Sequence, residues 1–150
     1  MDGQIYRGVG RGAAEIGHLL IDDKHTIEDV ASGFGIESYL SNQGLPYTTT
    51  RELGEAVHAR QPDALAVLRR AIDGLAVALT HVVTLLCPKV IVIGGGVSLI
   101  GEEHFFAPLR EAVARRAFKP FAGLTEIVPA ELGEEVVLHG ALALAKRGVA

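Results

Sequence analysis

The sequence has 150 residues, 49% of them hydrophobic and 21% charged, and a formal net charge of −4. This length suits one domain with a substantial core and excludes a complete two-lobed enzyme. Because the charge is negative and the basic residues are scattered, we expect no nucleic-acid binding by this chain. The N-terminus has no secretory signal, and charged residues or prolines interrupt the apolar runs. We therefore expect a cytoplasmic protein that does not enter a membrane.

The first third of the chain is expected to contain two short strands and one helix. Residues 4–7 follow an Asp-Gly turn signal, and residues 19–21 are an apolar triplet ended by charged residues, so both predict strands. Thr26-x-x-Asp29 has the form of a capping box and predicts a helix that begins there. The side chains expected to be buried follow helical spacing: Ile27, Val30, Ala31 and Phe34.

The middle third is dominated by one long predicted helix. Thr49-x-x-Glu52 is a second capping signal and predicts a short helix to about His58. From Pro62 onward, apolar residues recur at steps of three and four until Pro88 forbids continuation. Cys87, the only cysteine, lies in an apolar run and is expected to be a small buried hydrophobe.

The last third alternates predicted strands with predicted helices. Residues 90–93 form a continuous β-branched run, typical of a strand covered on both faces, and Gly94-Gly95-Gly96 follows it. Residues 110–118 predict a helix, 126–129 a short strand and 136–146 a closing helix. This alternation indicates one α/β domain.

Two carboxylates and an imidazole are the most informative polar residues. Glu15 and His18 lie in Gly12-Ala13-Ala14-Glu15-Ile16-Gly17-His18, and Glu37 follows in Gly35-Ile36-Glu37-Ser38. Each of them alone is typical of a solvated surface residue. Carboxylates accept hydrogen bonds, and a neutral imidazole both donates and accepts them. Held together, the three groups can bind several vicinal hydroxyls at once, which indicates carbohydrate recognition.

These motifs, with Val90-Ile91-Val92-Ile93-Gly94-Gly95-Gly96-Val97-Ser98 and Leu138-His139-Gly140-Ala141-Leu142-Ala143-Leu144-Ala145, resemble the ROK family of sugar kinases and sugar-responsive repressors. The resemblance implies that residues 1–150 are one C-terminal lobe of an actin-like, ribonuclease H-like ATPase fold, with a mixed sheet and flanking helices. It covers the second half of a typical member. The family's phosphate loop, Asp-x-Gly-Gly-Thr, and its catalytic aspartate belong to the first half, and neither is matched in these residues, so we assign no catalytic residue here.

The resemblance also implies roles for individual residues. Glu15, His18 and Glu37 match positions that hold sugar hydroxyls in the kinases. Gly94, Gly95 and Gly96 match a loop on the adenosine side of the ATP site, and Gly133 falls on its far wall. ATP with Mg²⁺ is the expected cofactor of a full-length member. A triple glycine alone is most often only a tight turn.

Structural zinc is expected to be absent. Zinc-binding members of the family place Cys-x-Cys-Gly-x-x-Gly-Cys after the histidine, and its three cysteines fall on Glu28, Val30 and Gly35. We expect apolar packing of the helix from Thr26 to replace the metal. A rival site of mixed donors stays open, formed by His18, His25, Glu28 and Asp29.

Three functions are compatible with these features. The first is half of an ATP-dependent hexose or N-acetylhexosamine kinase, inactive alone, and the second is the sugar-sensing lobe of a repressor. The third is a non-catalytic dimerisation remnant. The expected partners are a small-molecule sugar and either a second copy or a complementing N-terminal lobe, without a metal, nucleic acid or membrane.

Overall fold

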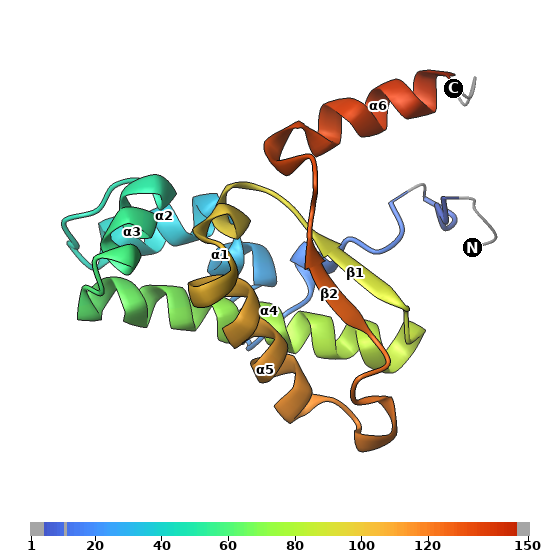
Figure 1. Ribbon diagram of the computed structural model, residues 1–150, viewed down its shortest axis with the longest axis horizontal. Helices are drawn as coiled ribbons and strands as arrows, with labels where there is room; N and C mark the ends of the chain where they lie inside the picture. Colours follow the sequence, from blue (N-terminus) through green and yellow to red (C-terminus); the bar gives the residue numbers. More distant parts are fainter. Residues whose placement is uncertain (1–4, 11, 147–150) are drawn as a thin grey trace.

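The computed structural model describes residues 5–10 and 12–146 and has an α/β architecture (Figure 1). Its principal helices and strands are α1 (Ile27–Ala31), α2 (Gly33–Asn42), α3 (Thr50–His58), α4 (Pro62–Leu86), β1 (Val90–Ile93), α5 (Ala107–Arg116), β2 (Glu126–Pro129) and α6 (Val136–Lys146). Short helical turns connect them: η1 (Ile16–His18), η2 (Gly96–Ile100), η3 (Glu102–Phe106), η4 (Lys119–Phe121) and η5 (Gly133–Glu135).

The long helix α4 is the base on which the other helices pack. Figure 1 shows α4 running across the molecule, with α1, α3 and α5 against it. It begins with Pro62 at the first helical position, where a missing N–H costs nothing. Leu68, Ile72 and Leu79 of the predicted stripe are buried, but Leu65 and Leu86 at its two ends are exposed, so the predicted burial is wrong there. The expectation for Cys87 is wrong. Cys87 lies beyond the last turn in a left-handed conformation with φ 41° and is exposed, because the chain turns away from the core before Pro88.

The two capping signals form as predicted. In α1, Thr26 accepts from the Asp29 N–H while the Asp29 carboxylate accepts from the Thr26 N–H, and Thr49 and Glu52 do the same for α3. The first of these helices is shorter than expected, because the backbone is extended at Ser32, whose side chain caps the next helix, α2. This break places Phe34 at the exposed start of α2, with 80% of its surface accessible, so its predicted burial is wrong.

Strands β1 and β2 form a parallel pair, with Val90 opposite Glu126 and Ile93 opposite Pro129. The mixed character expected of the sheet is not seen among the described residues. Residues 5–7 are not in a strand, and residue 4 lies outside the described part; residues 19–21 contribute only an isolated antiparallel bridge between Leu20 and Thr26. Strand β1 is not covered on both faces, since Val92 is 60% exposed.

The two outer edges of the sheet differ. Glu126 N–H donates to the Lys89 carbonyl at 2.9 Å and Ala130 N–H to the Ile93 carbonyl at 2.8 Å. Alternate residues of a parallel strand bond to the same neighbour, so the backbone groups of Val90 and Val92 point to the other edge, where no strand from residues 5–10 or 12–146 pairs with them. We call this the open edge of β1.

The outer edge of β2 is blocked instead. The Arg110 Nε–H donates to the Ile127 carbonyl at 2.7 Å, and Pro129 has no N–H to offer. Helix α6 has no buried residue and extends away from the α4 layer (Figure 1). None of the helices in the described part of the chain is both long and apolar enough to span a membrane.

Candidate functional site

Glu37 lies in a hollow of about 720 Å³ between α2, α3 and η2. The hollow is lined by Gly33, Phe34, Glu37, Thr49, Thr50, Arg51, Gly54, Glu55, His58, Gly96, Val97, Leu99 and Ile100. Its lining combines apolar surface with carboxylate, hydroxyl, guanidinium and imidazole groups, as sites for small polar ligands do.

One carboxylate oxygen of Glu37 is fixed by a residue of the next helix. The Thr50 N–H donates to Glu37 Oε1 at 2.9 Å, and the Thr50 hydroxyl lies 3.1 Å from the same oxygen. Thr50 is the first residue of α3, where the backbone N–H has no partner within the helix. Glu37 therefore satisfies a free helical donor while it remains at the wall of the hollow.

Glu15 and His18 lie elsewhere along the chain, around η1. Both are exposed, and η1 packs against α1. Neither residue lines the hollow of Glu37, and no hydrogen bond or ion pair joins the three side chains among the described residues. Their convergence on one ligand stays a prediction.

The glycine loop after β1 forms a wall of this hollow through Gly96. Gly95 has φ 96°, a conformation that favours glycine, and its carbonyl accepts from the Ser98 hydroxyl at 2.7 Å and the Ser98 N–H at 3.0 Å. Ser98 is buried, so the loop is held from the core side and presents bare backbone outward.

The same loop borders a second hollow of about 550 Å³, lined by Val92, Gly94, Gly95, Gly96, Ala130, Val136 and Val137. A Cβ added at Gly94 would lie 3.2 Å from Ala130 Cβ and 3.7 Å from the Gly133 carbonyl. The structure thus brings the predicted loop 94–96 beside Gly133. Because Gly96 belongs to both hollows, this loop is the partition between them.

The residues at the zinc positions of the family do not fit zinc. Val30 is buried among apolar side chains, and a Cβ at Gly35 would overlap the carbonyl oxygens of Glu28 and Asp29, the latter at 2.5 Å. A closed tetrahedral site needs four nitrogen, sulfur or carboxylate donors. Over residues 5–10 and 12–146, no three such side chains are grouped to hold a metal.

Two of the four rival donors, His25 and Asp29, hydrogen-bond to other residues. The His25 Nδ1 lies 2.9 Å from Asp22 Oδ2, and chiefly this hydrogen bond lowers the pKa of Asp22 to about 2. The Asp29 carboxylate accepts from the backbone and hydroxyl of Thr26, which lowers its pKa from the usual value. Within the described part of the chain, no three of His18, His25, Glu28 and Asp29 are grouped to hold a metal.

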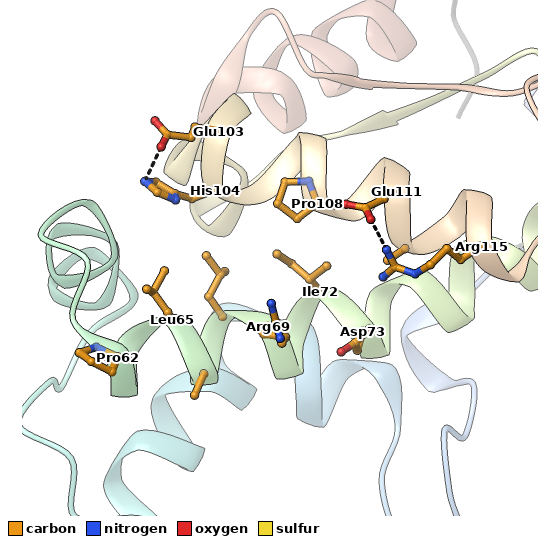
Figure 2. Close-up of a pocket in the computed structure, with 13 residues that line it drawn as sticks. Pro62, Leu65, Arg69, Ile72, Asp73, Glu103, His104, Pro108, Glu111 and Arg115 are labelled. Atoms are coloured by element: carbon orange, nitrogen blue, oxygen red, sulfur yellow. Dashed lines mark hydrogen bonds and ion pairs between the residues drawn. The ribbon is translucent and has the colours of Figure 1, made fainter.

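A third hollow of about 610 Å³ runs between α4 and the segment η3–α5 (Figure 2). In its lining, Arg115 pairs with Glu111 at 2.6 Å, and His104 Nε2 lies 3.7 Å from Glu103 Oε1. It contains none of the predicted site residues, so the hollow of Glu37 is the better candidate.

Thr50 is the site residue that the sequence prediction missed. The signal was present, because Thr49-x-x-Glu52 places residue 50 at the first position of a helix, with a free N–H. The local pattern does not identify the acceptor of this N–H, because Glu37 belongs to the preceding helix, α2.

Comparison with known proteins identifies the family of this chain. The model of the ROK family matches residues 1–148. The glucokinase of Thermotoga maritima is 30% identical over 165 aligned positions, which cover 95% of this chain and 51% of that protein. The chain thus spans about half the length of this relative.

Solved structures show the same fold. The ROK family glucokinase of Streptomyces griseus, in complex with glucose and AMPPNP, matches with a TM-score of 0.84 and 23% identity, over 96% of this chain and 55% of that one. A ROK family transcriptional regulator homologous to the E. coli MLC protein matches with a TM-score of 0.74 and 19% identity, over 86% and 37%. The α/β, actin-like fold class expected from the sequence is confirmed. The chain belongs to the ROK family.

Proposed function

We propose that this chain is the sugar-binding and adenosine-side lobe of an ATP-dependent hexose kinase. One observation supports the proposal: Gly96, in loop 94–96, lines both the hollow of Glu37 and the hollow beside Gly133. Phosphoryl transfer requires an acceptor hydroxyl and a nucleotide held on either side of the reacting phosphoryl group. Two hollows that meet at a partition of bare backbone suit this arrangement.

The proposal gives each predicted residue a role. Glu15, His18 and Glu37 hold hydroxyls of glucose or an N-acetylhexosamine, and the backbone of Gly94, Gly95, Gly96 and Gly133 lines the adenosine pocket. ATP is the phosphoryl donor, with Mg²⁺ on its phosphates, and the proposed location is the cytoplasm. Because these 150 residues contain no Asp-x-Gly-Gly-Thr sequence, we expect them to bind sugar without turning it over.

Calorimetric titration of the 150-residue chain with glucose and with N-acetylglucosamine tests the binding role. Glu37→Gln keeps the shape and loses the charge, so we expect the Kd to rise by about tenfold or more. Glu111→Gln removes a carboxylate in the groove of Figure 2 and serves as the matched control. Equal affinities for the two variants would contradict the proposal, and ADP release above background would contradict the expected lack of turnover.

A repressor's sugar-sensing lobe is the second candidate, since a ROK transcriptional regulator has the same fold. In that case Glu15, His18 and Glu37 have the same role and only the attached domain differs. The DNA upstream of the Met1 codon distinguishes the two: a frame encoding the phosphate-loop aspartate favours the kinase, and one encoding a helix-turn-helix favours the repressor.

Assembly is the third candidate role, and the open edge of β1 favours it. Val90 and Val92 of β1 are exposed, as are Leu86 at the end of α4 and Val137 and Leu138 of α6. Apolar patches beside an unpaired strand promote association. We propose a second copy or a complementing N-terminal lobe as the partner.

A further inference from the structure

We infer that Thr50 is a positioning residue that sets Glu37 for its ligand without a metal, by holding Oε1 and leaving Oε2 to the sugar. This inference rests on the proposed sugar-binding function. It concerns a contact that the sequence motifs do not include, between the start of α3 and the middle of α2.

The geometry makes Thr50 a two-point anchor. Its N–H and its hydroxyl both lie within hydrogen-bond distance of Glu37 Oε1, at 2.9 and 3.1 Å, and no protein group of the described residues donates to Oε2. Two donors on one oxygen restrict rotation of the carboxylate, because rotation breaks both hydrogen bonds. Oε2 then keeps its lone pairs for a hydroxyl of the ligand.

The helix that carries Glu37 is placed by close packing. Gly35 lies directly against the Glu28 and Asp29 carbonyls at the end of α1, where no side chain fits. Helix α1 in turn lies on α4 through Val30, whose Cγ1 would be 2.8 Å from a Cβ at Gly74. These two contacts involve residues 30 and 35, which the family resemblance aligns with cysteines of a zinc loop, so we infer that packing and Thr50 together fix Glu37.

A purely structural role for Thr50 would give different results. The Thr50 hydroxyl also lies 3.4 Å from the Gly33 carbonyl, so it also connects α2 with α3. If that connection were its role, Thr50 variants would change stability and leave the ligand affinity of the folded chain unaltered. A positioning role predicts an affinity change in a chain that remains folded.

The experiment combines substitution with a spectroscopic signature. Thr50→Val removes the hydroxyl and keeps the shape, so we expect the Kd for glucose or N-acetylglucosamine to rise about threefold to tenfold. Thr50→Ser keeps the hydroxyl and should restore the affinity. Thr84→Val, which removes a hydroxyl bonded to the Thr80 carbonyl on α4, is the control and should leave the Kd unchanged.

The signature is the amide resonance of Thr50, recorded by NMR at neutral pH. Glu37→Gln replaces the charged acceptor of the Thr50 N–H by a neutral one and should shift this resonance, whereas Glu111→Gln should leave it unchanged. Because no metal is proposed at this site, the spectrum should be the same before and after EDTA treatment. The purified chain should also contain no stoichiometric zinc.

The inference would be overturned if folded Thr50→Val bound the sugar as tightly as wild type, or if Thr50→Ser did not restore the affinity. It would also be overturned if the Thr50 amide resonance did not depend on Glu37, or if the chain held a zinc whose removal changed that resonance. If wild-type chain binds no sugar but shows the Glu37-dependent shift, the contact is supported and the proposed sugar-binding function fails. The two failures are therefore distinguishable.

Discussion

The missing side chain of Gly74 determines how closely α1 lies on α4. A Cβ there would lie 2.8 Å from Val30 Cγ1, and Val30 is buried. Because a β-branched side chain in a packed core has few alternative rotamers, the contact has little room to adjust. Gly74 is therefore explained by packing, although glycine within a helix costs about 1 kcal/mol relative to alanine.

Gly74→Ala should destabilise the chain. We expect about 1–3 kcal/mol of overpacking, partly offset by the better helix propensity of alanine. Gly140→Ala on α6 is the matched control, because its added Cβ meets nothing within 4 Å, and it should be neutral or stabilising. Urea unfolding of both variants measures the two effects, and equal stabilities would contradict this account of Gly74.

Single residues show where sequence reasoning reached its limit. Periodicity identified Val30 as buried, because it depends only on the position within a helix. It failed for Phe34, because the extended backbone at Ser32 ends the first helix before that residue. It also failed for Cys87, because this residue is itself in the left-handed turn that ends α4. Pro88 signals the end of α4 in the sequence, but the periodic pattern itself does not report that Cys87 leaves the core or that the backbone breaks at Ser32.

At the scale of elements, the capping boxes link stability to pH. Hydrogen bonds from the backbone and hydroxyl of Thr48, together with the Thr49 N–H, lower the pKa of Glu52 below its usual 4.5. A carboxylate whose pKa is lower in the folded state stabilises the fold above its unfolded pKa, and this contribution is lost as the pH falls through the folded value. The pKa of Asp22 is lowered in the same way, from 3.8 to about 2, so its contribution to stability is lost as the pH falls between these values.

We therefore expect the free energy of unfolding to fall as the pH is lowered from about 5 toward 2. Glu52→Gln should be less stable than wild type at neutral pH, and its stability should depend less on pH below 4.5. Urea titrations at several pH values give both quantities. Parallel pH profiles for variant and wild type would show that Glu52 has no part in the effect.

Whole elements were predicted better than the contacts between them. The caps of α1 and α3, the run of β1 and the middle of the α4 stripe all depend on residues close in sequence, and the structure confirms them. The shared wall between the two hollows depends on β1, β2 and α2, which are far apart along the chain. Only the resemblance to a known family suggested that loop 94–96 and Gly133 meet.

At the scale of the molecule, the open edge of β1 and the exposed face of Val92 make association the expected behaviour. Light scattering at micromolar concentration should give a mass above that of a monomer. Val92→Lys places a charge on this surface and should shift the chain toward the monomer. Leu124→Lys changes an exposed leucine outside the sheet and should have no such effect. A monomeric wild-type chain would contradict the assembly role.

The blocked edge of β2 limits how far such association can proceed. Two copies joined along β1 would present only β2 strands at their outer margins, where Arg110 already occupies the Ile127 carbonyl and Pro129 has no N–H to donate. A third copy would find no continuous row of partners, so growth stops at a pair. Valine and isoleucine, which make up β1, favour strand stacking, and the blocked edge of β2 opposes extension of the sheet beyond such a pair.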